Sequence, residues 1–271
     1  MTAPATHPAL PGALVTGAAA RIGRAIATAL AAEGRAVAVH YNRSGKAAEE
    51  TVSAIAESGG RAVAIKADLA DASAAAELVP RAAEALAGLD AQFGCLVNNA
   101  SLFEFDRVGE LGPESFDRHM AVNARAPALI MQAFAGHIAA DPVSGAVVIN
   151  ILDQKLRNPN PDHLSYTISK YALEGLTRTM ALACAPDIRV VGVAPGLTLP
   201  GGALDEAAFA TAAARLPLGR ATAVEDIAAT VCYVAAAPSI TGQTILVDAG
   251  QHLAATSRDV AFTEPEDEVE N

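Results

Sequence analysis

Leu-Val-Thr-Gly-Ala-Ala-Ala-Arg-Ile-Gly-Arg-Ala-Ile-Ala, residues 14–27, is the stretch of sequence that decides the fold of this chain. It combines the end of an apolar strand, a turn that contains Gly17, and the start of a helix that we expect to continue to about Gly34. Glycines let a backbone approach a pyrophosphate closely, and the N-terminus of the following helix adds N–H groups and a partial positive charge. The stretch therefore predicts a nucleotide-binding turn, although a purely structural turn fits the same pattern.

The second predicted strand, residues 36–41, tests this interpretation through the residues at its end. A site for NAD usually has an acidic residue near this point, which binds the 2′-hydroxyl of the ribose. None is present where the sequence reads His40-Tyr41-Asn42-Arg43-Ser44, and Arg21 takes the place of a glycine in the first turn. Two guanidinium groups that converge on a 2′-phosphate would select NADP(H) as the cofactor. The alternative is that both arginines are simply solvated.

Helices and strands alternate along the rest of the sequence, as expected for one compact α/β domain in a chain of 271 residues. The expected helices cover residues 46–58, 73–88, 113–139 and 168–183, and the expected strands cover residues 61–69, 95–100, 145–151, 188–194 and 244–248. We place the domain at residues 12–253, after a flexible N-terminal arm at residues 1–11. Residues 254–271 form an acidic tail in which we expect no fixed structure.

Composition and charge exclude several classes of function. The formal net charge is −11 and no run of Lys or Arg occurs, which argues against a nucleic-acid or anionic-membrane surface. Cys95, Cys184 and Cys232 lie in apolar runs without metal-ligand spacing, so we expect reduced core cysteines and no metal site. The first eleven residues lack a signal-peptide pattern. Pro and Gly interrupt the uncharged residues 227–247, which suits a buried helix, a turn and a buried strand better than a membrane span, so we expect a cytoplasmic protein.

The candidate catalytic groups lie between residues 150 and 170. The β-branched run at 145–151 predicts a strand buried on both faces, so Asp153 lies just beyond the end of a strand. Tyr166 and Lys170 are four residues apart on a predicted helix, and their head groups can therefore share one site. A fixed ammonium group favours the phenolate, so we expect Lys170 to lower the pKa of Tyr166. A surface tyrosine and lysine on an ordinary helix would show the same spacing.

Polar residues also follow other predicted strands, at points where apolar runs end. Asp68-Leu69 follows one strand, where the carboxylate can bind adenine, and Asn98-Asn99-Ala100 ends another. Pro195-Gly196-Leu197-Thr198 follows a third, and the loose stretch from there to Leu216 suits a substrate lid. Asn123 lies in an apolar helix, so we expect its amide to bind backbone groups or water beside the site.

Five motifs in this order resemble the short-chain dehydrogenase/reductase superfamily over about residues 12 to 252. They are Thr16-Gly17-x-x-x-x-Ile22-Gly23, Asn98-Asn99-Ala100, Asn123, Tyr166-x-x-x-Lys170 and Pro195-Gly196. The resemblance implies a single Rossmann-type doubly wound sheet of about seven parallel strands with helices on both faces, usually in a homotetramer. It also implies that NADP(H) is bound by Gly17, Arg21, Ile22, Gly23, His40, Tyr41, Asn42, Arg43, Ser44, Asp68, Leu69, Asn99, Ala100, Ser101, Asn123, Tyr166, Lys170, Pro195, Gly196 and Thr198.

Two departures from the superfamily pattern resemble the pteridine reductase branch, which includes bacterial dihydromonapterin reductases. Arg21 replaces the middle glycine of the turn, and Asp153 stands thirteen residues before the tyrosine, where a serine is usual. In that branch an aromatic residue matching Phe103 stacks a pterin ring, and residues matching Ser101 and Arg21 contact the substrate. The alternative for Phe103 is an ordinary core residue, and we interpret His163 as a loop residue.

The resemblance implies NADPH-dependent reduction of a dihydropterin, with dihydrofolate as a further candidate substrate. Tyr166 would donate a proton, Lys170 would hold the nicotinamide ribose and tune the tyrosine, and Asp153 would orient the substrate or donate a second proton. One alternative keeps the fold and NADPH but acts on a simple carbonyl or alcohol, because the predicted lid has no decisive polar anchor. The other is a nucleotide sensor without turnover, since a fold alone does not establish activity.

Overall fold

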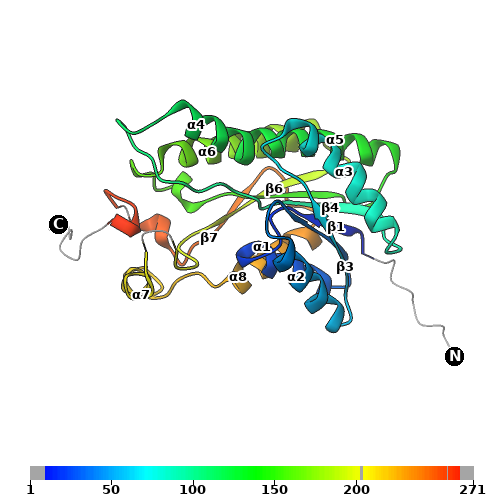
Figure 1. Cartoon of the computed structure of the whole chain (residues 1–271), viewed down its shortest axis with the longest axis horizontal. Helices are drawn as coiled ribbons and strands as arrows, with labels where there is room; N and C mark the ends of the chain where they lie inside the picture. Colours follow the sequence, from blue (N-terminus) through cyan, green and yellow to red (C-terminus); the bar gives the residue numbers. More distant parts are fainter. Residues whose placement is uncertain (1–9, 202–203, 255, 263–271) are drawn as a thin grey trace.

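The computed structural model describes residues 10–201, 204–254 and 256–262, and strands and helices alternate along it (Figure 1). Its strands are β1 (Gly12–Val15), β2 (Ala36–Tyr41), β3 (Arg61–Lys66), β4 (Phe93–Asn98), β5 (Val147–Ile151), β6 (Arg189–Pro195) and β7 (Thr244–Val247). Its α-helices are α1 (Arg21–Ala32), α2 (Gly45–Glu57), α3 (Ala72–Ala87), α4 (Pro113–Met120), α5 (Ala126–Ala140), α6 (Leu164–Ala183), α7 (Glu206–Ala214) and α8 (Val224–Ala236). The predicted order of elements is therefore confirmed.

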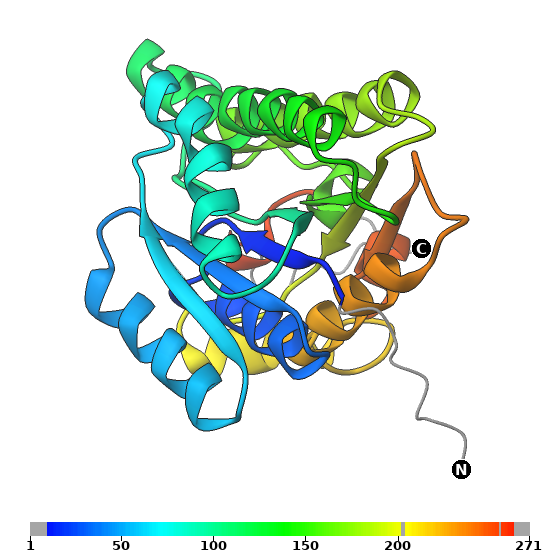
Figure 2. The same ribbon diagram turned by 90° about the vertical axis from the view of Figure 1, so that its right-hand side faces the viewer.

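The seven strands form one parallel sheet in the order β3-β2-β1-β4-β5-β6-β7. Helices α1, α2 and α8 cover one face and α3, α4, α5 and α6 cover the other, so the predicted doubly wound sheet is confirmed (Figures 1 and 2). The chain runs outward from β1 in one direction and from β4 in the other. Connections that diverge in this way leave a crevice at the carboxyl ends of the central strands, where ligands of such sheets bind.

Two apolar cores, one on each face, hold the central strands in place. Successive side chains of a strand point to opposite faces, so Leu14 packs in the core that contains Phe134 of α5, while Val15 packs in the core that contains Ile26 of α1. All four side chains are fully buried, and each contributes roughly 1.5–3 kcal/mol to folding by its burial. This packing fixes the strand ends from which the polar residues project.

The long helix predicted for residues 113–139 is interrupted at Asn123. Residues Ala121–Arg125 form a π-helical turn between α4 and α5. Pro127 follows at the start of α5, and because proline has no N–H, it cannot donate the helical bond to the residue four positions before it. π-turns are frequent at functional sites. The irregular turn is what directs the Asn123 amide out of the helix hydrogen-bond pattern and toward a neighbouring loop.

The prediction that the tail from residue 254 has no fixed structure is wrong for residues 256–262. Val260–Phe262 form a short 3-10 helix, and Arg258 and Asp259 make ion pairs with the body of the domain. Composition misled the prediction because it counts carboxylates and does not reveal that single residues have buried partners. The remainder of the tail and residues 1–9 of the predicted arm lie outside the described residues. Of the other two arm residues, Pro11 accepts a hydrogen bond from Arg35 at 2.7 Å.

Two further expectations concern the stretches around the site. The predicted loose lid at residues 197–216 contains helix α7, whose first turn is capped by the Asp205 carboxylate at 2.9 Å from the Ala208 nitrogen. The uncharged residues 227–247 are divided between α8 and β7, as predicted. Within the ranges described, no helix has the length and apolar character needed to cross a membrane.

Candidate active site

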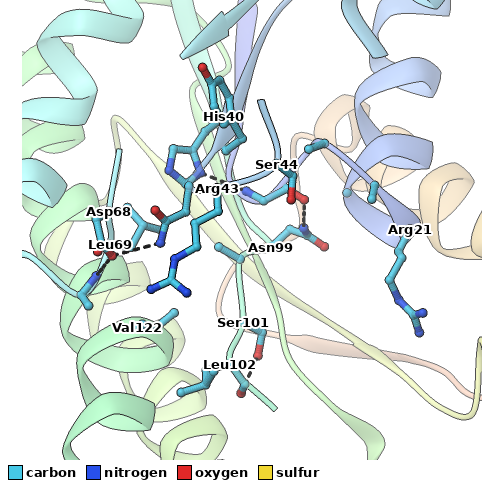
Figure 3. A pocket seen from close by; sticks show the side chains of 18 of the residues that line it. Arg21, His40, Arg43, Ser44, Asp68, Leu69, Asn99, Ser101, Leu102 and Val122 are labelled. Atoms are coloured by element: carbon cyan, nitrogen blue, oxygen red, sulfur yellow. Dashed lines mark hydrogen bonds between the residues drawn. The ribbon is translucent and has the colours of Figure 1, made fainter. Parts of the chain in front are cut away.

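A cavity of about 590 Å³ opens at the crevice beside β1 (Figure 3). Fourteen residues predicted to bind the cofactor line it, namely Gly17, Arg21, Ile22, Gly23, His40, Tyr41, Asn42, Arg43, Ser44, Asp68, Leu69, Asn99, Ala100 and Ser101. Arg118 of α4 also lines the cavity and pairs with Glu104 at 3.1 Å, and no pattern in the sequence had indicated it. The structure therefore brings together residues as far apart in the chain as Gly17 and Arg118.

The turn after β1 is shaped by two glycines that cannot carry a side chain. Gly17 has a φ of +63°, and a Cβ there would lie 2.9 Å from the Cα of Ala100. A Cβ at Gly23 would lie 2.2 Å from the carbonyl oxygen of Gly17. Asn99 locks the turn to the end of β4 by donating to the Thr16 carbonyl at 2.8 Å. Backbone groups therefore form the wall of the cavity here, which is what a pyrophosphate site requires.

His40 supports the same turn through a hydrogen bond to Gly17. Its Nδ1 accepts a hydrogen bond from the Gly17 N–H at 3.0 Å, and its Nε2 lies 3.2 Å from the Ala67 carbonyl oxygen, so Nε2 carries the proton. Burial lowers the pKa of this imidazole to about 4, so the ring is neutral at physiological pH. Both ring nitrogens are occupied. His40 lines the cavity, but its observed role is to position Gly17 and not to supply a charge to a ligand.

Arg21 and Arg43 lie on different sides of the cavity, so the expectation that they converge on one phosphate is wrong (Figure 3). Arg21 has a φ of +54° at the start of α1, and its Nη1 donates to the Pro200 carbonyl at 3.3 Å, in the predicted lid. Arg43 follows β2, where the neighbouring Asn42 amide donates to Asp68 at 3.2 Å. The hydrogen bond to Pro200 thus holds the Arg21 side chain at the predicted lid. Arg43 is thus the arginine placed at the expected 2′-phosphate position.

Asn123 supports the cavity without lining it. Its Oδ1 accepts from the Leu102 N–H at 2.7 Å, and its Nδ2 donates to the Leu102 carbonyl at 2.9 Å and to Ser169 Oγ at 2.9 Å. The expectation that this amide binds backbone groups is confirmed. Because the residue is buried and its amide is fully engaged, Asn123 fixes the loop that follows β4 and is not itself free to contact a cofactor.

Asp153, Tyr166 and Lys170 come together beyond the end of β5. The Tyr166 hydroxyl donates to Asp153 Oδ2 at 2.6 Å, and the Lys170 Nζ donates to the Ile151 carbonyl at 2.8 Å. The Lys170 ammonium lies 5.5 Å from the centre of the Tyr166 ring. The other Asp153 oxygen accepts from the Lys155 N–H at 2.8 Å. The sequence prediction that the head groups of Tyr166 and Lys170 can share one site is confirmed in its geometry, and the Asp153 carboxylate lies beside them.

Burial changes the acidity of all three groups. It raises the pKa of Asp153 above its usual value and lowers the pKa of Lys170 to about 8. Burial, together with the adjacent Asp153 carboxylate, raises the pKa of Tyr166 well above its usual value. The expectation that Lys170 lowers the tyrosine pKa is therefore wrong for this state, because desolvation and a directly bonded carboxylate outweigh an ammonium one helical turn away. The phenol retains its proton, as a proton donor must.

Phe103 packs against Tyr166 of this catalytic group. It is not a core residue, because 55% of its surface is exposed. Its ring stacks on His163, with centres 4.1 Å apart, and meets the Tyr166 ring edge-on at 4.6 Å. His163 immediately precedes α6 with a φ of +54°, and its Nδ1 donates to the Glu104 carbonyl at 3.1 Å. The sequence interpretation of His163 as a loop residue missed this stacking, although its position three residues before Tyr166 was a usable signal.

The Pro195-Gly196-Thr198 stretch lies at the same edge of the sheet but does not line the cavity. A Cβ at Gly196 would lie 2.7 Å from the Cβ of Asp248, so the backbone passes close to the end of β7. The Thr198 hydroxyl donates to the Gly196 carbonyl at 2.7 Å. Among the residues that the structure describes, no group of three or more His, Cys, Asp or Glu side chains is arranged to hold a metal ion.

The fold and this arrangement of side chains define a dinucleotide-binding oxidoreductase. A family model described as enoyl-(acyl carrier protein) reductase matches residues 17–252, and the chain belongs to the short-chain dehydrogenase/reductase family. The solved structure of FolM alternative dihydrofolate reductase 1 from Brucella canis, complexed with NADP, is similar, with 41% sequence identity and a TM-score of 0.85. The match covers 93% of this chain and 97% of that one.

Two relatives known from sequence carry names that do not mention a pterin or a folate. An uncharacterised oxidoreductase of Methylorubrum extorquens is 35% identical over 246 residues, covering 88% of this chain and 96% of the relative. A versicolorin reductase of Emericella nidulans is 33% identical over 255 residues, covering 88% of this chain and 94% of the relative. The comparisons thus agree on an oxidoreductase and differ in the substrate that the named relatives reduce.

Proposed function

We propose that this protein is an NADPH-dependent reductase of pterins that converts a dihydropterin to a tetrahydropterin. The observation that carries the proposal is the hydrogen bond between Tyr166 and Asp153, at 2.6 Å, beneath the half-exposed ring of Phe103. An aromatic face and a carboxyl group suit a flat ring with a nitrogen-rich edge. The 41% identity to a structure described as a dihydrofolate reductase complexed with NADP supports the same substrate class.

NADP(H) fits the residues at the end of β2. Arg43 supplies a guanidinium group, Asn42 and Ser44 supply neutral polar groups, and no acidic side chain occupies residues 40–44. A guanidinium group can bind a 2′-phosphate with two charge-assisted hydrogen bonds, whereas a carboxylate there would repel it. The backbone wall at Gly17 and Gly23 leaves room for the pyrophosphate that the two cofactor forms share.

The chain's own groups can complete the reduction of a C=N bond. NADPH, when bound, supplies the hydride that adds to the ring carbon. The neighbouring nitrogen then gains an electron pair and becomes strongly basic, and Tyr166 donates its phenolic proton there, although its pKa is raised. Asp153 stabilises the tyrosine hydroxyl and orients the substrate edge. Lys170 keeps a positive charge beside the site below about pH 8, which stabilises the phenolate formed.

A second candidate is an NADPH-dependent reductase of a non-pterin carbonyl compound. The relative named versicolorin reductase, 33% identical, favours it. Tyr166 and Lys170 would serve a ketone equally well, so only Asp153 and Phe103 distinguish the two candidates. A nucleotide sensor without turnover is disfavoured by the buried, hydrogen-bonded Tyr166 and Lys170.

A substrate panel with NADPH tests the proposal. We expect the highest kcat/KM for a dihydropterin among dihydrobiopterin, dihydromonapterin, dihydrofolate, a quinone and an activated ketone. A higher value for the ketone or quinone would establish the second candidate instead. No NADPH oxidation with any of them would contradict both. The homotetramer usual for the family belongs to this proposal as well, and light scattering of the purified protein measures it.

A further inference from the structure

The C-terminal segment of residues 256–262 returns to the edge of the sheet that holds the catalytic groups. Arg258 donates to Asp162 through Nε and Nη2, both at 2.8 Å, and the Asp259 N–H donates to the same carboxylate at 2.8 Å. The Asp162 side chain is buried, and the bond from Arg258 lowers its pKa. A bidentate, charge-assisted pair of this kind fixes orientation as well as position. The segment is therefore anchored immediately before α6.

A second ion pair anchors the segment beside Asp153. The Lys155 Nζ lies 3.1 Å from Asp259 Oδ2, and the Lys155 side chain is almost fully buried. The backbone N–H of the same lysine donates to Asp153. A buried ammonium group without a partner would be costly, so Asp259 is needed where it lies. Two independent contacts thus hold this segment next to the catalytic carboxylate.

The anchored segment extends a row of aromatic rings outward from Tyr166. Phe103 meets Tyr166 and stacks on His163, as described above. Phe105 meets His163 edge-on at 5.3 Å, and Phe262 contacts Phe105 at 5.0 Å and lies 6.0 Å from His163. Arg258 lies 5.6 Å from the Phe262 ring. Along this row, the rings of Phe103 and His163 lie between Tyr166 and the outer pair Phe105 and Phe262.

The loop that carries Phe103 and Phe105 is held in place by hydrogen bonds to its buried residue Asp106. Asp106 is buried and accepts hydrogen bonds from the Ser165 N–H at 2.9 Å and from the Ser165 hydroxyl. On the other side, the short helix that ends at Phe262 contacts α7 of the predicted lid. Phe105 nevertheless remains 42% exposed. An exposed ring that is fixed on several sides offers a preformed apolar contact.

We propose that Phe105 and Phe262, backed by the buried ring of His163, form an outer aromatic subsite, which binds a flat substituent extending from the substrate ring, and that Arg258 positions it. The inference rests on the proposed function, because it places the pterin ring itself against the exposed side of Phe103, within reach of the Tyr166 hydroxyl. The subsite would make the protein prefer a pterin that carries an aryl substituent, because that substituent gains contacts which a compact pterin lacks.

The test compares the dissociation constants of dihydrofolate, whose aryl group extends from the pterin, and of 6-methyl-dihydropterin, which lacks one. Both are measured by calorimetry on the full chain with saturating NADP⁺. We expect Phe262→Ala and Arg258→Ala to weaken dihydrofolate binding roughly 3- to 10-fold, the range for loss of one aromatic contact. Binding of 6-methyl-dihydropterin is expected to change less than twofold. Phe262→Tyr, which keeps the ring, is expected to bind dihydrofolate like the unmodified protein.

Arg220→Ala is the matched control, since it removes an Arg–Asp pair of similar length, at 3.0 Å to Asp226, away from the site. Equal weakening of both ligands in Phe262→Ala, or no change in either, would overturn the subsite, as would failure of the unmodified protein to bind either compound. Because Phe262→Ala leaves both ion pairs intact, it decides the question even if Arg258→Ala unfolds. Binding with the expected ratio but without turnover would contradict the proposed function and leave the subsite standing.

Discussion

The turn after β1 and the catalytic group of Asp153, Tyr166 and Lys170 lie at one edge of the sheet, but they are built differently. The turn consists of backbone held by close contacts. Gly17 and Gly23 leave no space for a side chain, and Asn99 donates a hydrogen bond to the Thr16 carbonyl. The catalytic group consists of charged and polar side chains that are buried, and burial sets the pKa of each of them. Substitutions at the turn should therefore act on cofactor binding, and those at the catalytic group on proton transfer.

The largest expected effect is the loss of the proton donor. Tyr166→Phe keeps the ring against Phe103 but removes the hydroxyl, so kcat is expected to fall roughly 100- to 10,000-fold. Binding of NADPH, measured by fluorescence titration, is expected to change little. Tyr171→Phe is the control on the same helix, because its hydroxyl donates to the Leu156 carbonyl, at 3.3 Å, and not to Asp153. Near-normal turnover by Tyr166→Phe would show that another group is the acid.

A smaller effect is expected at the cofactor end. Arg43→Ala removes the guanidinium group at the end of β2, and a charge-assisted phosphate contact is worth roughly 1.5–3 kcal/mol. We expect kcat/KM with NADPH to fall about 10- to 100-fold while the value with NADH stays the same. Arg21 points toward the lid, so Arg21→Ala is expected to raise the KM of the pterin. The ratio of kcat/KM with NADPH to kcat/KM with NADH is expected to stay the same. Equal efficiency of both cofactors in the unmodified protein would contradict this assignment.

Asp153→Ser separates a pterin reductase from a carbonyl reductase. Serine cannot present a carboxyl group to the nitrogen-rich edge of a pterin, so kcat/KM for dihydrobiopterin is expected to fall more than about tenfold, the loss that a single hydrogen bond of 1.4 kcal/mol explains. An activated ketone is expected to react as well as before or better, since a serine hydroxyl can donate to its oxygen. The pterin proposal fails if the ketone is the better substrate of the unmodified protein and the substitution improves it further.

The pH dependence gives the smallest expected change. Because burial lowers the pKa of Lys170 to about 8, its ammonium group is present below that pH and is lost above it. We expect kcat/KM, which reports the free enzyme, to fall as the pH rises past about 8, by up to about tenfold per unit. Rates measured in a series of overlapping buffers from pH 6 to 10 check this. A profile that stays flat up to pH 10 would mean that the charge of Lys170 is not needed.

Much of the cofactor end was determined by the sequence alone. The strand, the glycines and the helix start of residues 14–27 are consecutive, and their spacing fixes a local backbone shape that a pattern can predict. The same holds for the cavity-lining residues at the end of β2 and directly after β4, since each group lies where an apolar run ends. Asp153, Tyr166 and Lys170 were also recognisable, because a strand end and a helical spacing place them without knowledge of the rest.

Only the tertiary structure decided how these groups behave and what surrounds them. The pKa of Tyr166 is raised mainly by burial, and segments distant in the chain must pack together to bury this side chain. Arg21 and Arg43 lie on different sides of the cavity, and Arg21 is hydrogen-bonded to Pro200, which is 179 positions away in the chain. The contact of Phe262 with Phe105 joins residues more than 150 positions apart, and it depends on the two ion pairs that anchor residues 256–262. Spacing along a chain records local backbone geometry, whereas desolvation and long-range contacts exist only once the chain has folded.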